Sequence, residues 1–222
     1  MAISSLIDKQ DNFEIIRDEV AAILAIETAS QQALATAGGK DPDLWKFRVF
    51  IEQSNPLEQY LNAPLDTSPI VNVFFDTESF NKSHSNMNNR QKAEGIINID
   101  CYGYAVSADN PGGGHIPGDR GAAYEVQRAA RLVRNIIMAE EYDRLGLPLG
   151  GPLWSRWISS IDMYQQPAET NVQNVASSRL QLQVEYNELS PQTDAEVLEL
   201  LSATVKRFET GEIYFEADFD YT

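Results

Sequence analysis

Apolar and polar residues alternate through the centre of the chain, and an alternation of period two predicts β-strands. Between Arg179 and Tyr186 every second residue is apolar, and the residues between them are Arg, Gln or Glu. Glu94–Val106 shows the same period, with Ile97 and Ile99 on one face. Because successive side chains of a strand point to opposite faces, both segments are expected to bury one face and expose the other.

Four further stretches are predicted as strands from their apolar positions. The C-terminal stretch is the most regular of them. It needs a partner, either in the sheet of the same chain or in a neighbouring subunit. The four predicted strands are Trp45–Glu52, Ile70–Phe75, Leu153–Tyr164 and Glu209–Thr222.

Apolar residues spaced three and four apart predict helices over Asp11–Ala37, Arg120–Leu145 and Thr193–Phe208. Each predicted helix starts at a capping signal. The capping residues are Asp11 with Glu14, Asp119, and Thr193 with Glu196. The first helix is expected to bury Ile16, Val20, Ile23, Leu24 and Leu34. The central helix is expected to bury Ala123, Val126, Ala130, Val133, Ile136 and Ile137.

These elements predict an α+β fold, in which the central amphipathic helix packs on an antiparallel sheet. The predicted fold also includes additional N- and C-terminal helices and a C-terminal strand. We expect one domain over residues 1–190 and a helix–strand extension over 191–222. Two polar or Gly-rich loops, 76–90 and 107–121, are expected to project from the domain. Loops of this length are typical of binding elements or of disorder, and we expect both loops and the C-terminal strand to contact other proteins.

The composition is that of a globular protein with one domain or one domain plus an appendage. The chain has 222 residues, of which 43% are hydrophobic. No apolar run approaches the ~20 residues that span a bilayer, and the N-terminus does not resemble a secretory signal. The single cysteine, Cys101, is expected to be a small buried hydrophobic residue in a protein made in a reducing cytoplasm.

The formal net charge is −16, which argues against sequence-independent binding of nucleic acid, because that binding depends on Lys and Arg. The charge is uneven: residues 185–222 hold ten acidic and two basic side chains. Two interpretations stay open. The acidic end meets a basic surface of another copy, or it is a solvated surface that keeps the protein soluble.

No motif in the sequence predicts catalysis. The glycine cluster at 112–121 lacks the Lys-Ser/Thr pair of a phosphate-binding loop. His84 and His115 lie in the predicted loops, without a nearby cysteine or second histidine to complete a metal site. No Gly-x-Ser-x-Gly elbow is present. We therefore expect no enzymatic activity, no cofactor and no metal.

The strongest interface candidates are the arginines of the central helix that lie off its apolar stripe. Arg128, Arg131 and Arg134 form either an ordinary solvated face or a surface that meets carboxylates of an adjacent copy. Trp154 and Trp157 are either core residues or interface anchors. The remaining interface candidates are His115 of the Gly-rich loop and Phe215 and Phe219 of the C-terminal strand.

The order of four segments resembles the tail-terminator, or tail-completion, proteins of tailed bacteriophages and related contractile particles. The segments are SPIVNVFF, QKAEGIINIDCYGYAV, AAYEVQRAARLVRNII and VASSRLQLQVEYNE, which follow an N-terminal helix. The resemblance covers Ile70 to about Glu188. Relative to the smaller members, three parts of the chain look like additions: the segment Leu44–Asn62, the two long loops and the residues after Pro191.

The resemblance implies a structural protein of the virion, assembled in the host cytoplasm. It implies a homohexameric ring that seats on the last ring of the tail tube protein, ends tube polymerisation and offers its other face to the neck or connector protein. In a contractile particle the ring would also contact the sheath protein. DNA would only pass through the lumen, and no membrane would be involved. The alternatives are another neck component, such as a head-completion or stopper protein, and a small-molecule-binding domain that uses the Gly-rich loop near His115.

Overall fold

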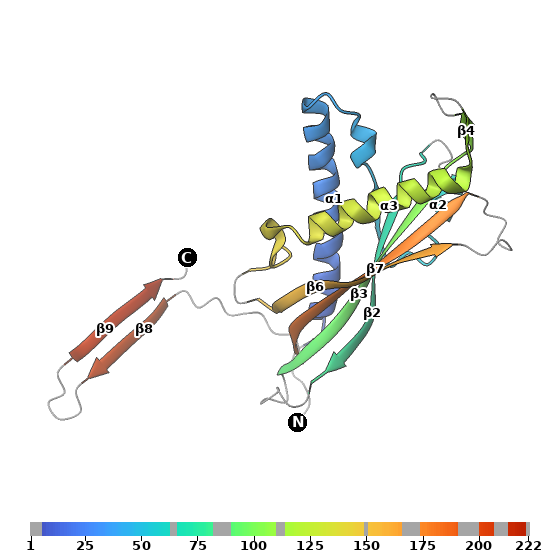
Figure 1. The fold of residues 1–222 in the computed structure, drawn as a ribbon. Helices are drawn as coiled ribbons and strands as arrows, with labels where there is room; N and C mark the ends of the chain where they lie inside the picture. Colours follow the sequence, from blue (N-terminus) through green and yellow to red (C-terminus); the bar gives the residue numbers. More distant parts are fainter. Residues whose placement is uncertain are drawn as a thin grey trace. The chain divides into compact units, whose positions relative to one another are not determined.

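The computed structural model describes residues 6–62, 66–81, 90–109, 114–148, 151–165, 174–190, 200–206 and 213–220. The chain divides into two compact units, Met1–Gln192 and Thr193–Thr222. The first unit holds the long helices and a five-stranded sheet, and the second holds a two-stranded hairpin (Figure 1). Each unit is described by itself below.

The five-stranded sheet has the order β1-β2-β3-β7-β6. Four of its strands are antiparallel, as expected, but β1 pairs with β2 in parallel, so the sheet is mixed. Two parallel strands need a connection of about a dozen residues or more between them. Residues 52–69, which include the short helix α2 (Glu58–Asn62), form this connection. The strands are β1 (Arg48–Ile51), β2 (Ile70–Phe80), β3 (Arg90–Tyr104), β6 (Leu153–Gln165) and β7 (Val175–Leu189).

Two long helices cover one face of this sheet. α1 (Asn12–Ala37) packs on β1, β2 and β7, and α3 (Gly118–Ile137) packs on β3 and β7 and crosses α1 (Figure 1). The alternation of β3 and β7 explains this arrangement, since most of their buried apolar residues share one face, which the helices cover. The core includes Ile97, Ile99, Leu180, Leu182, Val184 and Tyr186 from these two strands. The predicted α+β class is confirmed.

A close approach between α3 and β3 depends on Gly103. A Cβ atom at this position would lie 2.6 Å from the carbonyl oxygen of Ala122 and 3.0 Å from the backbone nitrogen of Val126. Both atoms belong to the backbone of α3, so they cannot rotate away as a side chain could. Glycine at 103 therefore sets how closely the helix lies on the sheet.

Cys101 is completely buried on the helix side of β3, as expected. Burial raises the pKa of the Cys101 thiol to about 12. At pH 8 the thiolate, which is the reactive form, would be ~10⁻⁴ of the total even if a reagent reached it. We expect native protein to resist a thiol-reactive disulfide reagent at pH 8, whereas protein unfolded in denaturant reacts with one equivalent. Rapid labelling of the native protein would contradict this placement.

Several predicted boundaries in the first unit were wrong. Residues 76–80 and residue 90, predicted as loop, belong to β2 and β3, which form a long hairpin. The polar run there continues the strand because its backbone pairs with β3 and Glu78 accepts a hydrogen bond of 2.8 Å from the Tyr186 hydroxyl. His84 lies outside the described residues. In the 107–121 region, β4 (Ala108–Asp109) pairs with β5 (His115–Ile116), and α3 already begins at Gly118.

The structure also corrects helix ends. The N-cap of α3 is Pro117, and Asp119 lies within the first turn. The helix ends at Ile137, well before Leu145, and is followed by the 3-10 helix η3 (Glu140–Tyr142). Trp45, predicted to start a strand, instead ends the 3-10 helix η1 (Pro42–Trp45), because Asp41 and Pro42 form a capped helical turn before the alternating residues begin. At α1, the carboxylate of Glu14 accepts the backbone N–H of Asp11, as the capping signal predicts.

The second unit contains no helix in its described part. Residues 200–206, predicted to be helical, form β8 (Leu200–Lys206), which pairs with β9 (Ile213–Asp220). The apolar residues at 201, 203 and 205 have a two-residue period and are the register partners of Phe219, Ala217 and Phe215. This period decides the structure there, whereas the capping signal at Thr193 and Glu196 lies outside the described residues. The predicted C-terminal strand is confirmed as β9, with β8 as its partner.

Candidate protein interface

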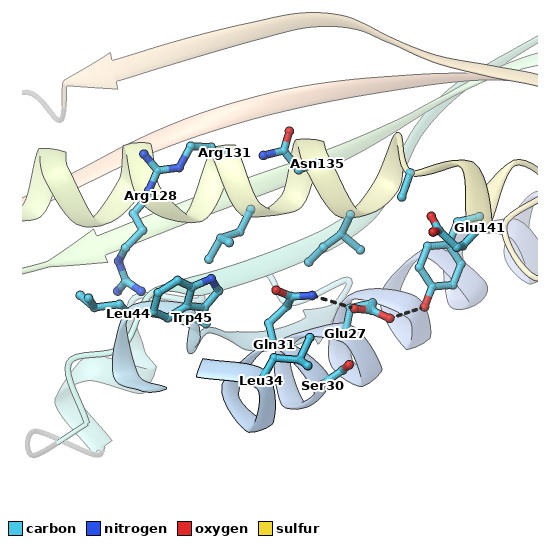
Figure 2. Close-up of a pocket in the computed structure, with 14 residues that line it drawn as sticks. Glu27, Ser30, Gln31, Leu34, Leu44, Trp45, Arg128, Arg131, Asn135 and Glu141 are labelled. Carbon is cyan, nitrogen blue, oxygen red and sulfur yellow. Dashed lines mark hydrogen bonds between the residues drawn. The ribbon is translucent and has the colours of Figure 1, made fainter. Parts of the chain in front are cut away.

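An open groove lies between α1, η1 and α3 in the first unit, with a volume of about 780 Å³ (Figure 2). Its apolar surface comes from Leu44 and Trp45 of η1, Leu34 of α1, and Leu132 and Ile136 of α3. Leu34 is 62% exposed and Leu44 is 48% exposed. Two leucines this exposed beside a tryptophan form an apolar strip open to solvent.

The position of Leu34 corrects the predicted apolar stripe of the first helix. Ile16, Val20, Ile23 and Leu24 are buried as expected, but beyond Thr28 the helix buries only Ala35. The C-terminal half of α1 projects past the sheet (Figure 1), so the helical period continues there without a core to pack on. An apolar helix face that the subunit leaves uncovered indicates a surface for another molecule.

One end of the groove is acidic. The Tyr142 hydroxyl donates a hydrogen bond of 2.7 Å to the carboxylate of Glu27, and this bond raises the pKa of Tyr142 to about 12. Glu141 lies beside them (Figure 2). The hydrogen bond holds Glu27 in place, and Glu141 provides a second carboxylate at this end of the groove.

The other end of the groove is basic, but its two arginines differ. Arg128 was expected on the outer face, yet its side chain is only 13% exposed. It forms an ion pair with Glu125 and donates a hydrogen bond of 3.0 Å to the carbonyl oxygen of Asp43, which ties α3 to η1. Arg131 is exposed, lines the groove and has no ion pair or hydrogen bond to any described residue. Figure 2 shows both arginines at the end opposite Glu141.

The other two predicted interface residues of the first unit do not line this groove. Arg134 is exposed on α3 but does not line it. His115 is exposed on β5, with its Nδ1 atom 3.8 Å from an Asp109 carboxylate oxygen. Phe215 and Phe219 lie in β9 of the second unit, and the structure describes their strand pairing alone.

The two tryptophans of β6 have different surroundings. Trp154 is largely exposed, with the Lys92 ammonium 5.3 Å from the centre of its ring, so it is not a core residue. Trp157 is half-buried. Arg156, between them, donates to the carbonyl oxygens of Ala139, Tyr142 and Asp143 and so binds the segment that follows α3. Burial lowers the pKa of Arg156.

A polar cluster that sequence reasoning missed lies on the sheet face away from α1 and α3. Arg179 of β7 makes two hydrogen bonds to Asp100 of β3, of 2.7 and 2.9 Å, and its guanidinium lies 5.2 Å from the ring centre of Phe74 on β2. Hydrogen bonding to Asp100 raises the pKa of Arg179. Asn98, the register partner of Phe74, is completely buried. The residues were visible as polar positions in alternating strands, but their pairing depends on the β3–β7 register, which the sequence does not specify.

Strand β6 was predicted as a strand, but the sequence did not reveal that it lies at the edge of the sheet. It is the last strand of the sheet order, and among the described residues no strand pairs with its outer side. Three large side chains near its end are about half exposed: Ile161 at 44%, Met163 at 48% and Tyr164 at 48%. An open edge strand with apolar side chains can pair with another strand.

No family model matches this chain, and no curated protein is significantly similar to it in sequence. Within the described residues, no group of three or more His, Cys, Asp or Glu side chains is placed to hold a metal ion. None of the described helices has the length and apolar character required to cross a membrane. The groove has apolar side chains along its length and opposite charges at its two ends.

Proposed function

We propose that this protein is a structural subunit that associates with copies of itself in a ring. The observation that carries the proposal is the exposed apolar strip of Leu34, Leu44 and Trp45. Arg131, which pairs with no described residue, lies at one end of it, and Glu27 and Glu141 lie at the other. A surface with an apolar centre and charged ends matches the anatomy of protein interfaces. The charged ends would fix the orientation of the partner.

The occupant we propose for the groove is a second copy of the chain. The net charge of −16 and the eight acidic against two basic residues in 193–222 provide carboxylates that could pair with Arg131 of a neighbour. A contact between two different surfaces of identical subunits closes into a ring when the rotation between copies is suitable. An isolated subunit would then leave the groove open, as the single chain does.

The kind of ring that we propose is the tail terminator of a tailed bacteriophage, which the pattern of residues 70–188 resembles. Such a ring would stack on the last ring of the tail tube, prevent further addition and present its other face to the neck. The acidic composition supports this role, because a negative lumen repels the phosphate backbone of passing DNA. In this proposal the protein is a component of the virion, and it acts through contacts alone. A head-completion or stopper protein would use the same kind of assembly with different neighbours.

A small-molecule site in the groove is the second candidate, because about 780 Å³ lies within the usual range of ligand pockets. Exposed Leu34 and Leu44 favour a macromolecule, since a small ligand would leave much of these side chains in water. The oligomeric state and the melting temperature distinguish the two functions. A monomer whose melting temperature rises with a metabolite favours the ligand site, and a ring favours assembly.

Charge reversal at Arg131 tests the groove as an interface. We expect Arg131→Glu to weaken self-association about tenfold, ~1.4 kcal/mol, because it places a like charge against the acidic partner surface. The fold should be unaffected, since Arg131 is exposed and pairs with no described residue. Light scattering over a concentration series measures the association.

The matched control is Arg134→Glu, which makes the same charge change one turn along α3 and outside the groove. A much smaller effect of this variant locates the contact at the groove. An unchanged association of Arg131→Glu at physiological salt would exclude the groove as the interface. Arg128→Glu is unsuitable, because Arg128 is already paired within the subunit.

A further inference from the structure

We infer that strand β8 of one copy pairs with the free edge of β6 in a neighbouring copy. The inference rests on the proposed self-association and names a second contact between copies. It starts from two incomplete surfaces of the same chain: an edge strand without an outer partner, and a hairpin of two strands.

The β6 edge is incomplete in its backbone and in its side chains. The strand is 13 residues long and pairs only with β7 among the described residues, so its outer N–H and C=O groups have no strand partner. Ile161, Met163 and Tyr164 are 44–48% exposed near its end. Proteins usually protect such an edge by charges, by proline or by a covering element. Asp162 is the only charged residue in 157–165 and this stretch holds no proline, although the strand has a register shift between Ile158 and Ser160.

The hairpin is incomplete because it has only two strands. A two-stranded hairpin is marginally stable in water, and it needs a third strand or a packing surface to become stable. β8 is 7 residues long and β9 is 8 residues long. In their register, Leu201, Ala203 and Val205 of β8 each lie opposite an apolar residue of β9. The exposed half of β6, about seven residues from Ile158 to Tyr164, has the length of one of these strands.

Charge selects β8 as the strand that pairs with β6. Strand β8 has the sequence LLSATVK, with no acidic residue and one lysine, whereas β9 has the sequence IYFEADFD, with three acidic residues. If β8 lies beside β6, it brings no acidic residue near the exposed Asp162. If β9 lay there, its acidic residues would repel Asp162. Strand β9 then becomes the new outer edge. Its acidic residues oppose the addition of another strand, so the pairing stops after one hairpin.

The length of the connection favours a neighbouring copy over the same chain. The connection from Leu189 of β7 to Leu200 of β8 has eleven Cα–Cα steps and spans at most ~36–40 Å when fully extended. An antiparallel β8 on residues 158–164 begins opposite Tyr164, which pairs with Ser177 of β7, and Ser177 lies twelve residues, about 40 Å, from Leu189, where the connection starts. The same chain could reach this point only with a fully stretched connection. A neighbour in a ring has no such limit.

A complementation experiment tests the inference on the full chain. Ile161→Asp disables the acceptor edge and keeps the hairpin, whereas Thr204→Pro disables β8 as a donor and keeps β6, because proline lacks the N–H that an edge needs. We expect each variant alone to show a lower mass by light scattering than the wild-type protein. A 1:1 mixture should then show a higher mass than either variant alone at the same total concentration. Ile26→Asp, at an exposed isoleucine of α1, is the matched control for the added charge and should keep the wild-type mass.

Hydrogen exchange provides the second readout and separates the possible failures. In the wild-type assembly the amides of residues 158–164 should exchange at least tenfold more slowly than in Thr204→Pro. A chain that ends at Gln192, at the boundary between the two units, should match Thr204→Pro if the proline acts only through the hairpin.

Three results would overturn the inference. If the wild-type protein is a ring and both variants keep its mass and exchange rates, the β6 contact is wrong and the proposed ring stands. If the wild-type protein is monomeric but Thr204→Pro accelerates exchange in β6, the hairpin pairs within its own chain. If the wild-type protein is monomeric and its β6 amides exchange freely, both the inference and the proposed function fail.

Discussion

Replacing Gly103 by alanine is expected to lower the free energy of unfolding by about 3 kcal/mol, near the upper end of typical overpacking costs. The added methyl group would lie 2.6 Å from the carbonyl oxygen of Ala122 and 2.8 Å from the Val126 side chain. Because the nearest atom belongs to the helix backbone, the strain is relieved only by moving α3 away from β3. Residues Val126, Ala129 and Val133, which are buried against the sheet, would then lose packing.

Urea unfolding followed by circular dichroism measures this cost, at a protein concentration where a single association state prevails. Gly38→Ala is the matched control. Gly38 has a φ of −83°, and a Cβ atom there would lie 3.3 Å from its nearest neighbour, so we expect a change within about 0.5 kcal/mol. If Gly103→Ala were as stable as the wild-type protein, the close packing of α3 on β3 would be wrong.

Replacing Arg179 by methionine is expected to destabilise the protein by about 2–4 kcal/mol, which is below the usual cost of breaking a buried pair because the arginine is itself one-third exposed. The variant leaves the carboxylate of Asp100, whose side chain is 10% exposed, without its bidentate partner. It also removes the guanidinium from the Phe74 ring, next to the buried Asn98. Either water must then reach the Asp100 carboxylate on this face of the sheet, or the negative charge of Asp100 must stay unpaired.

The double variant Asp100→Asn/Arg179→Met separates the charge from the packing. Removing both charges should recover about half of the loss, since no unpaired carboxylate remains. Arg134→Met, which removes an exposed arginine without a described partner, should change the stability by less than about 0.5 kcal/mol. A single Arg179→Met variant that is as stable as Arg134→Met would show that the pair contributes nothing.

The sequence predicted the core elements well, because their signal is local. The alternation in β3 and β7 and the apolar period of α3 each follow from burial of one face, and all three elements formed where that period runs. The wrong predictions arose where a second signal competed. At Thr193 a capping pattern suggested a helix, yet residues 200–206 form a strand because β9 pairs with them. At Asp76 a polar composition suggested a loop, yet pairing with β3 extends the strand.

The candidate interface was predictable only in part. The sequence identified Arg131 as a residue off the apolar stripe, and the structure places it at the edge of the groove. It could not show that Arg128 pairs with Glu125 and the Asp43 carbonyl group, because that contact depends on where η1 lies relative to α3. The exposure of Leu34 was also hidden, since the helical period alone does not reveal where the sheet ends.

The mass of the full-length protein in solution at physiological salt tests the central claim most directly. The account predicts a species of about six times the 24.8 kDa of one chain, which appears as a closed ring in electron micrographs. A mass of 24.8 kDa that persists to the highest attainable concentration would contradict it.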